Sequence, residues 1–457
     1  MSANTQPTEH KMGAMPIPKL LITMSLPMII SMLVQAFYNI VDSIFVARID
    51  EAALTAVSMA FPIQNLMIAV CSGTCVGVNA LLSRSLGEQK PKDAQSAATN
   101  GLFLAVLGAI AFALFGIFGA RAFFASQTND PLIIEYGVQY LQICTIFSFG
   151  LFLEITLERI LQSTGRTIYN MYSQGIGAIT NIILDPIMIF GLFGFPALGI
   201  RGAAIATVLG QIFAMFLSLL FNLKFNSDIS IKMRGFRPHG QTIRIIYAVG
   251  IPSIIMISIS SAMTYGLNLI LGALDTVAVT ILGVYFKLQS FVFMPVFGLN
   301  NGMIPIIAYN YGAKNKKRII DTIKLSIIIA IGIMLAGLVL FQTFSVQLLQ
   351  LFNASDNMLK EGVPALRQIS LSFIFAGYCI IVSSVFQALG NGVYSLIVSI
   401  ARQLLCILPA AYFLANTFGL HTAWYAFPLA EIVSLTLCTI LFKRIYNQKI
   451  KIIDKYS

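Results

Sequence analysis

The chain has 457 residues, of which 57% are hydrophobic and only 10% are charged. A soluble domain carries about 25% charged residues, so the composition excludes an ordinary soluble protein and predicts an integral membrane protein. The net charge of +11 could indicate nucleic-acid binding, but the positions of the bases predict membrane topology instead. The six cysteines lie in apolar segments, and we expect neither a metal site nor a disulfide there.

Apolar stretches of about 20–30 residues recur twelve times, and each is long enough to cross a bilayer as a helix. The segment before Leu20 is polar, so no signal peptide is expected. The sequence therefore predicts an all-α integral membrane protein with twelve transmembrane helices. Their approximate spans are 20–47, 53–83, 95–120, 133–158, 167–192, 199–223, 243–271, 276–309, 319–343, 364–386, 393–415 and 421–442.

The basic residues give the orientation of these spans. If the N-terminus is cytoplasmic, 22 of the 29 Lys and Arg fall in segments on the cytoplasmic side. Because cytoplasmic loops of membrane proteins carry an excess of Lys and Arg, both termini are predicted to be cytoplasmic. This placement accounts for the net positive charge without a nucleic-acid partner.

The second half of the chain repeats the first in one constant register, in which Pro27 matches Pro252. In the same register, the Gly-x-x-x-Gly motif that begins at Gly73 in span 2 recurs at Gly298 in span 8. Such motifs let helices approach closely, and we give them a structural role.

Each repeat unit holds six spans, so the two units point the same way in the membrane. We predict two six-helix lobes related by a pseudo-two-fold axis along the membrane normal. The N-lobe is placed at 1–223 and the C-lobe at 243–457, joined by a polar cytoplasmic linker at 224–242.

Acidic residues inside two spans are the strongest functional signal. Asn181 and Asp185 are four apart in span 5 and share a helix face, as do Tyr38 and Asp42 in span 1. Pro186 also leaves one carbonyl of span 5 without its helical donor. Two carboxylates, an amide and a free carbonyl are hard oxygen ligands suited to a small cation or a shared proton. The alternative is that each Asp is protonated and hydrogen-bonded, with only a structural role.

The C-lobe has no matching acids. At the same register, Asp42, Asn181 and Asp185 are replaced by Leu267, Cys406 and Ala410. Two bases, Lys287 and Arg402, lie within C-lobe spans together with one acid, Glu431. One base is expected to pair with Glu431, which leaves the other free to face a central cavity.

A further charged group, Glu154, Glu158 and Arg159, lies near the cytoplasmic end of span 4. A Glu–Arg pair at the level of the lipid headgroups is predicted there.

Taken together, these features resemble the multidrug and toxic compound extrusion (MATE) family. The resemblance is carried by the two six-helix lobes, by "NIVDSIFVAR" in span 1, and by the Asn-x-x-x-Asp of span 5. The segment "YNYGA" at 309–313 resembles the bacterial MepA-like and DinF-like branches. The resemblance covers the chain after position 15, although Ala47 stands where relatives usually have Gly.

The resemblance implies a cation-coupling site in the N-lobe, formed by Asp42, Asn181, Asp185, the Ala203 carbonyl and the Thr207 hydroxyl. In a Na⁺-coupled protein, Asp42, Asn181, Asp185 and Thr207 would hold the metal ion. It also implies a substrate cavity, to which we assign Gln35, Tyr38, Asn39, Lys287, Arg402 and Glu431.

The implied function is multidrug efflux by antiport with Na⁺ or H⁺ in a bacterial cytoplasmic (inner) membrane. The partners would be small-molecule drugs and the lipid bilayer. No enzymatic activity and no cofactor besides the coupling ion are expected, and the chain is expected to be a monomer. The nearest alternative is a lipid or lipid-linked oligosaccharide flippase of the same superfamily, because cavity bases suit a pyrophosphate headgroup. An intramembrane aspartyl protease would lack its usual Gly-Asp motif and would have no use for a twelve-span repeat.

Overall fold

The computed structural model describes residues 10–231, 236–352 and 354–455, and these residues contain helices but no β-strand. The helices of the first half are α1 (Lys11–Ala14), α2 (Ile17–Ala47), α3 (Glu51–Gly87), α4 (Pro91–Phe118), α5 (Ala120–Ala125), α6 (Pro131–Ile146), α7 (Phe149–Ser163), α8 (Thr167–Phe190) and α9 (Ile200–Phe225). A short 3₁₀ turn, η1 (Leu192–Gly194), separates α8 from α9.

The second half follows the same plan. Its helices are α10 (Gly240–Gly272), α11 (Thr276–Gly312), α12 (Lys316–Thr343), α13 (Ser345–Gln350), α14 (Asp356–Ser370), α15 (Phe373–Ala388), α16 (Gly392–Ile400), α17 (Leu408–Phe418), α18 (Leu420–Ala423) and α19 (Ala426–Ile445). A π-helical segment, η2 (Ala401–Ile407), joins α16 to α17, and the chain continues through η3 (Tyr446–Ile450) and η4 (Lys451–Lys455).

Ten of the described helical segments are long and apolar enough to cross a membrane. Two further spans are bent pairs, α6 with α7 at 43° and α14 with α15 at 46°. Counting each pair as one span gives up to twelve, so the predicted all-α membrane fold is confirmed. The bends lie in spans 4 and 10, which occupy the same place in the two halves.

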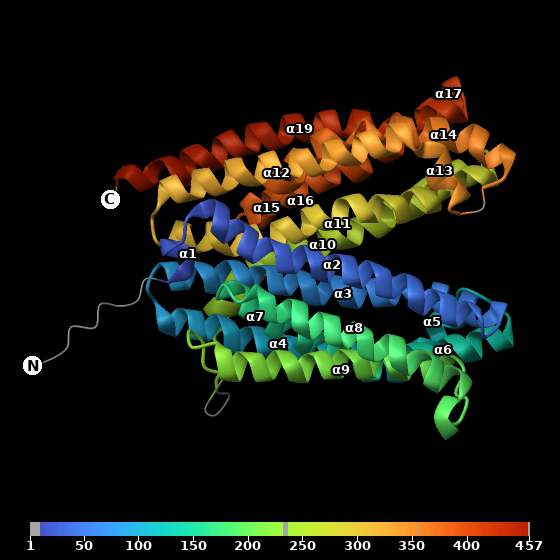
Figure 1. Cartoon of the computed structure of the whole chain (residues 1–457), viewed down its shortest axis with the longest axis horizontal. Helices are drawn as coiled ribbons and strands as arrows, with labels where there is room; N and C mark the ends of the chain where they lie inside the picture. Colours follow the sequence, from blue (N-terminus) through green and yellow to red (C-terminus); the bar gives the residue numbers. More distant parts are fainter. Residues whose placement is uncertain (1–9, 232–235, 353, 456–457) are drawn as a thin grey trace, which may run out of the picture.

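The helices form two bundles that meet along α2, α3, α10 and α11 (Figure 1). Helices α2–α9 make up one bundle and α10–α19 the other, in agreement with the predicted lobes. The exact boundaries at 223 and 243 stay a prediction, and residues 232–235 of the predicted linker lie outside the described part. We call the end of the molecule that holds α1 and η4 the terminal end, and the opposite end, with α5, α13 and α17, the far end (Figure 1).

Glycines bring the two bundles into backbone contact. A Cβ added to Gly73 of α3 would lie 2.6 Å from the backbone nitrogen of Ile254 on α10. A Cβ added to Gly298 of α11 would lie 2.5 Å from Cα of Ile29 on α2. Neither position has room for a side chain, so the two Gly-x-x-x-Gly motifs are the surfaces on which the lobes pack.

Toward the far end the lobes separate. Three turns of α-helix take about eleven residues, so a residue eleven positions from a contact residue lies on the same helix face. On α2, α3, α10 and α11 these residues are exposed; they are Ile40, Pro62, Tyr265 and Lys287. Figure 1 shows α2 and α11 diverging in that direction. The described residues therefore form a cleft between the lobes that is open at the far end.

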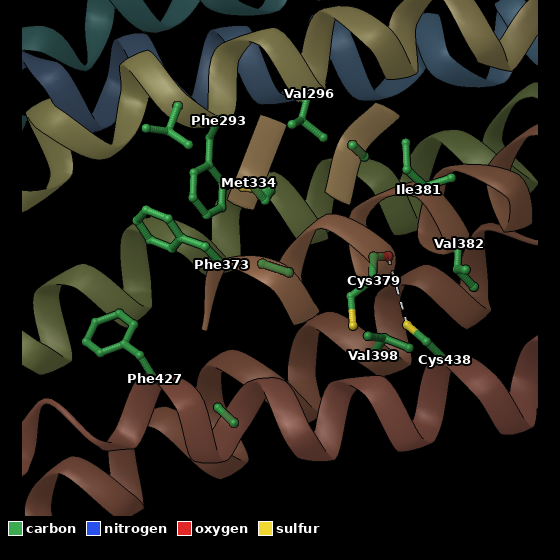
Figure 2. Packing of buried hydrophobic residues seen from close by; sticks show 14 of the residues in the cluster. Phe293, Val296, Met334, Phe373, Cys379, Ile381, Val382, Val398, Phe427 and Cys438 are labelled. Carbon is green, nitrogen blue, oxygen red and sulfur yellow. Dashed lines mark hydrogen bonds between the residues drawn. The ribbon is translucent and has the colours of Figure 1, made fainter. Parts of the chain in front are cut away.

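Aromatic rings pack among aliphatic side chains in the core of the second lobe (Figure 2). Phe293 of α11 lies 5.3 Å from Phe373 of α15, ring centroid to ring centroid, and Phe373 in turn contacts Phe341 of α12. Edge-to-face pairs of this kind stabilise beyond the area they bury. They fix α11 against the rest of the C-lobe.

The N-terminal segment fastens the two lobes together at the terminal end. The buried Met12 carbonyl accepts hydrogen bonds from Asn310 Nδ2 (3.1 Å) and Arg318 Nη2 (2.9 Å) of the C-lobe. On the other side, Lys11 Nζ donates to the Gly165 carbonyl of the N-lobe at 3.1 Å. Segment 10–15 therefore spans the joint between the lobes.

Asp228, in the loop after α9, holds the start of this segment. Its carboxylate accepts a hydrogen bond from Arg166 and lies 3.6 Å from His10 Nε2. The His10 ring also stacks on Tyr309 of the C-lobe at 5.0 Å. Burial alone would raise the pKa of Asp228, but hydrogen bonds from His10 and Arg166 and the charge of Arg166 lower it to about 2.

We expect Asp228→Asn to loosen the N-terminal segment at neutral pH. Because the pKa of Asp228 falls from 3.8 to about 2 on folding, its contribution is present above pH 3.8 and lost as the pH falls through about 2. The protection of the amides at 11–15 against hydrogen exchange, taken relative to the intrinsic rate at each pH, should therefore fall in Asp228→Asn at neutral pH, and in wild type only after strong acidification. Asp321→Asn, an exposed acid at the same end, is the matched control. Equal exchange in both variants would contradict this role.

Candidate functional site

Two carboxylates from different helices meet inside the first lobe. Asp42 of α2 and Asp185 of α8 lie within hydrogen-bonding reach of each other. Asp185 is fully buried and Asp42 is half-buried. In each of them Oδ1 has no hydrogen-bond partner among the described residues. Buried oxygens without donors are costly unless a proton or a cation satisfies them.

Asn181 and Thr207 complete this group. In one orientation the Asn181 amide donates from Nδ2 to Thr207 Oγ1 at 3.3 Å. In the other it donates to Asp185 Oδ2 and accepts from the Thr207 backbone nitrogen, both at 3.0 Å. The second orientation satisfies both neighbours, which is how an amide is assigned. The predicted residues of spans 1, 5 and 6 are thus brought together.

Ala203 is buried on α9, one turn before Thr207. In a regular helix its carbonyl would accept from the Thr207 nitrogen, which here is also within reach of Asn181. That competition leaves the Ala203 carbonyl with capacity to act as a ligand. Of the predicted cavity residues on α2, Gln35 and Asn39 are exposed, whereas Tyr38 reaches the Thr207 side chain inside the lobe.

We call the polar surroundings of Asp42 and Asp185 inside the lobe the enclosure. Three of its residues were not predicted, namely Gln64 of α3 and Tyr140 and Cys144 of α6. Gln64 Nε2 lies 3.2 Å from the Tyr140 hydroxyl and 3.9 Å from Cys144 Sγ. Tyr140 and Cys144 both lie close to Asp42. Their spacing by four was a visible signal, because it puts two polar side chains on one face of an apolar span.

The chemistry of the enclosure suits a proton or a monovalent cation. None of the ion pairs formed by described residues includes Asp42 or Asp185. Nor do three or more His, Cys, Asp or Glu gather anywhere in the described part of the chain. Two carboxylates with neutral amide and hydroxyl oxygens are a weak set for a transition metal.

In the C-lobe, an ion pair lies in the region that corresponds to the Asp42–Asp185 enclosure of the N-lobe. Arg402 Nη1 lies 2.9 Å from Glu431 Oε1, and their side chains are 26% and 8% exposed. Arg402 lies in the π-helical segment, and Glu431 on α19. The structure thus decides which base pairs with Glu431. Both residues lie within the lobe beside Tyr285, away from the glycine-lined joint.

Lys287 has a different environment. It is exposed on the face of α11 that turns toward the other lobe, and its Nζ lies 5.9 Å from the centre of the Phe352 ring. Phe352 follows α13 at the far end. Lys287 therefore stands at the mouth of the cleft, while Arg402 is held inside the lobe.

The predicted Glu–Arg pair in span 4 is wrong. Arg159 Nη1 donates to Gln162 Oε1 (2.7 Å) and, across the lobes, to Asn301 Oδ1 (3.0 Å). Glu158 instead accepts from the Ser173 hydroxyl and from the Gln174 amide, both at 2.8 Å. The neighbouring lobe, which local sequence does not show, offers the arginine neutral acceptors.

Two lobes of six spans, a joint of close backbone contacts and a polar enclosure beside an open cleft define a multi-pass membrane transporter. The MatE family model matches residues 27–187 and again 252–413. The chain belongs to the MatE family, a family of transporters rather than enzymes. The two matches begin at 27 and 252, the same pair of positions that the internal repeat relates.

Among named relatives, the multidrug export protein MepA of Staphylococcus haemolyticus (strain JCSC1435) is 25% identical over 431 residues, which are 94% of each chain. MepA of Staphylococcus aureus (strain bovine RF122 / ET3-1) is 24% identical over 427 residues, 91% of each chain.

Solved structures agree on the fold. An outward-facing multidrug resistance MATE family transporter of the MOP superfamily superposes with a TM-score of 0.90 at 24% identity, covering 98% of this chain and 99% of the other. A MOP superfamily transporter from Pyrococcus furiosus Vc1 (DSM3638), described as having a binding pocket of reverse polarity, gives a TM-score of 0.87 at 24% identity and the same coverage.

The two C-lobe bases should respond differently to removal of their charge. Arg402→Met leaves Glu431 buried and unpaired, and breaking such a pair destabilises by about 3–5 kcal/mol. We expect strongly reduced amounts of protein in the membrane and a lower melting temperature. Lys287→Met, at the mouth of the cleft, should leave both unchanged. Quantitative immunoblotting and thermal unfolding in detergent check this, and equal losses in the two variants would contradict the assignment.

Proposed function

We propose that the chain is a multidrug efflux transporter that exports amphipathic, mostly cationic small molecules in exchange for Na⁺ or H⁺. The observation that carries the coupling is the Asp42–Asp185 pair of the N-lobe, in which two carboxylates lie together, each with an unpartnered oxygen, and no described base pairs with them. The names of the MepA relatives support drug export. The test is transport measured with each ion gradient imposed separately.

The site can bind an ion because two adjacent carboxylates resist joint ionisation. A proton or Na⁺ entering through the open cleft neutralises the pair. Asn181, Thr207 and the Ala203 carbonyl then supply the remaining oxygen contacts. For a membrane potential of 100 mV, inward movement of one charge releases about 2.3 kcal/mol. That is enough to drive export against a gradient of roughly fiftyfold.

Helix α2 connects ion binding to lobe movement. Tyr38 lies nine positions after Ile29, which is about two and a half helical turns, so the two point in opposite directions. One face of α2 thus packs on Gly298 of the other lobe while the opposite face carries Tyr38 and Asp42. A change in the charge of the enclosure acts on the helix that makes the joint, which favours a lobe movement that releases the drug.

The orientation follows from charge. With the terminal end in the cytoplasm, the basic loops lie inside and the cleft faces outward. We infer a bacterial cytoplasmic (inner) membrane, with both termini cytoplasmic and a monomer as the transporting unit. A lipid or lipid-linked oligosaccharide flippase is less well supported, because Arg402 is engaged by Glu431 and only one of the two intramembrane bases, Lys287, reaches the cleft.

Asp42→Asn and Asp185→Asn should each abolish export while the protein still inserts at normal levels. The reason is that an amide cannot exchange a proton or neutralise Na⁺. The matched control is Leu267→Ala, the equivalent of Asp42 in the C-lobe, which should keep its ion dependence. Drug uptake into inverted vesicles under a Na⁺ or an H⁺ gradient measures all three. Full export by Asp42→Asn would end the coupling proposal.

Lys287→Met should shift the substrate profile toward more highly charged cations, because it removes a repelling charge from the mouth of the cleft. Efflux of a dication relative to a monocation should rise several-fold, with wild type and Lys324→Met as references. An unchanged ratio would place Lys287 outside the substrate path.

A further inference from the structure

A cavity of about 520 Å³ lies at the terminal end, outside the proposed transport path. It is lined by both lobes and by the C-terminal segment. The N-lobe contributes Arg84 and Lys90, the C-lobe contributes Lys314, and Lys449 comes from η3. The substrate and ion groups described above lie in the far half, so this cavity needs its own explanation.

The charges of this cavity do not balance. Among the described side chains that line it, the one acid is Glu88, which accepts from Arg84 Nε at 2.7 Å and from Lys90 Nζ at 2.8 Å. Lys449 Nζ donates to the neutral Leu389 carbonyl at 2.6 Å, and Lys314 forms no ion pair with the described residues. In the described lining, four bases therefore face one carboxylate. A concave site with this excess attracts anions.

The bases are held in place by the joint between the lobes. Gly87, at the end of α3, packs on the Tyr309 carbonyl, and its repeat equivalent Gly312, at the end of α11, packs on the Arg84 carbonyl. The Arg84 guanidinium lies over the ring of Tyr311 at 5.3 Å. Lys314 has a φ of 56°, which is uncommon for a residue with a side chain. The cavity is thus a built feature of the closed terminal end.

The remaining lining favours a lipid over a free anion. Ile452 and Ile453 give the cavity an apolar wall beside the bases. The cavity lies where the candidate membrane spans of α3 and α11 end, at Gly87 and Gly312, and lipid headgroups are expected near the ends of such spans. Basic pockets between helices on the cytoplasmic side suit anionic lipid headgroups. We propose that this cavity binds the phosphate headgroup of an anionic phospholipid, which bridges the two lobes and holds the terminal end closed.

Lipid retention by the purified full-length protein tests the site. Phosphatidylglycerol, phosphatidylcholine of the same chain length, and glycerol 3-phosphate are titrated separately, and bound molecules are counted by native mass spectrometry. Lys314→Gln/Lys449→Gln is compared with Lys224→Gln/Lys324→Gln, which removes two bases that do not line the cavity. We expect one tight phosphatidylglycerol in wild type and control. The affinity should fall roughly thirtyfold in the cavity variant, since two lysines are removed.

Other results would overturn the proposal. Equal retention of phosphatidylglycerol and phosphatidylcholine would show that the bases set the orientation of the chain in the membrane and do not bind an anionic headgroup. Equal affinity for glycerol 3-phosphate would show a free-phosphate site without a lipid. Equal loss in both double variants would show a diffuse charge effect.

The proposed bridging of the two lobes by the lipid headgroup is measured separately. Spin labels at positions 92 and 317, on opposite lobes, report opening of the terminal end, and the native cysteines are buried or half-buried. Phosphatidylglycerol should increase the population at short distance in wild type and in Lys224→Gln/Lys324→Gln, but not in Lys314→Gln/Lys449→Gln. Export defects of Asp42→Asn leave this result unaffected. An unchanged distance distribution in wild type would refute the bridge.

Discussion

The rest of the structure depends on close backbone packing between the two lobes. In lipid, helices gain no hydrophobic energy by associating, so close contact between backbones has to supply the attraction. Gly73 and Gly298 supply it twice, because the repeat places the same motif on α3 and on α11. Each motif packs against the first helix of the opposite lobe. The joint is therefore symmetric in its backbone, although the side chains of the two lobes differ.

The asymmetry lies in the charges. The Asp42–Asp185 site of the N-lobe holds two acids and neutral polar groups, whereas the C-lobe holds an ion pair there, Arg402 with Glu431. An acid pair changes its net charge when it takes up an ion, but a salt bridge holds its charge constant. In the proposed mechanism, the N-lobe therefore responds to ions while the C-lobe keeps its charge. Ion binding in the N-lobe alone would then drive the movement of the lobes.

Sequence was sufficient wherever a property is local or repeated. Hydrophobic length predicted the spans, the internal repeat predicted the lobes, and spacing by four brought Asn181 beside Asp185. It was insufficient where a partner comes from a distant segment. Arg159 pairs with Asn301 across the joint, and nothing near position 159 indicates this. The choice between Lys287 and Arg402 as the partner of Glu431 likewise depended on which helices are neighbours.

The π-helical segment at Ala401–Ile407 lies in the second half of the internal repeat, and it bears on how the two halves differ in length. A π turn holds one residue more than an α turn. The two family matches begin at 27 and 252 and end at 187 and 413, so the second match is longer than the first by a single position. One extra residue in the second half, taken up as a wide helical turn, fits both observations.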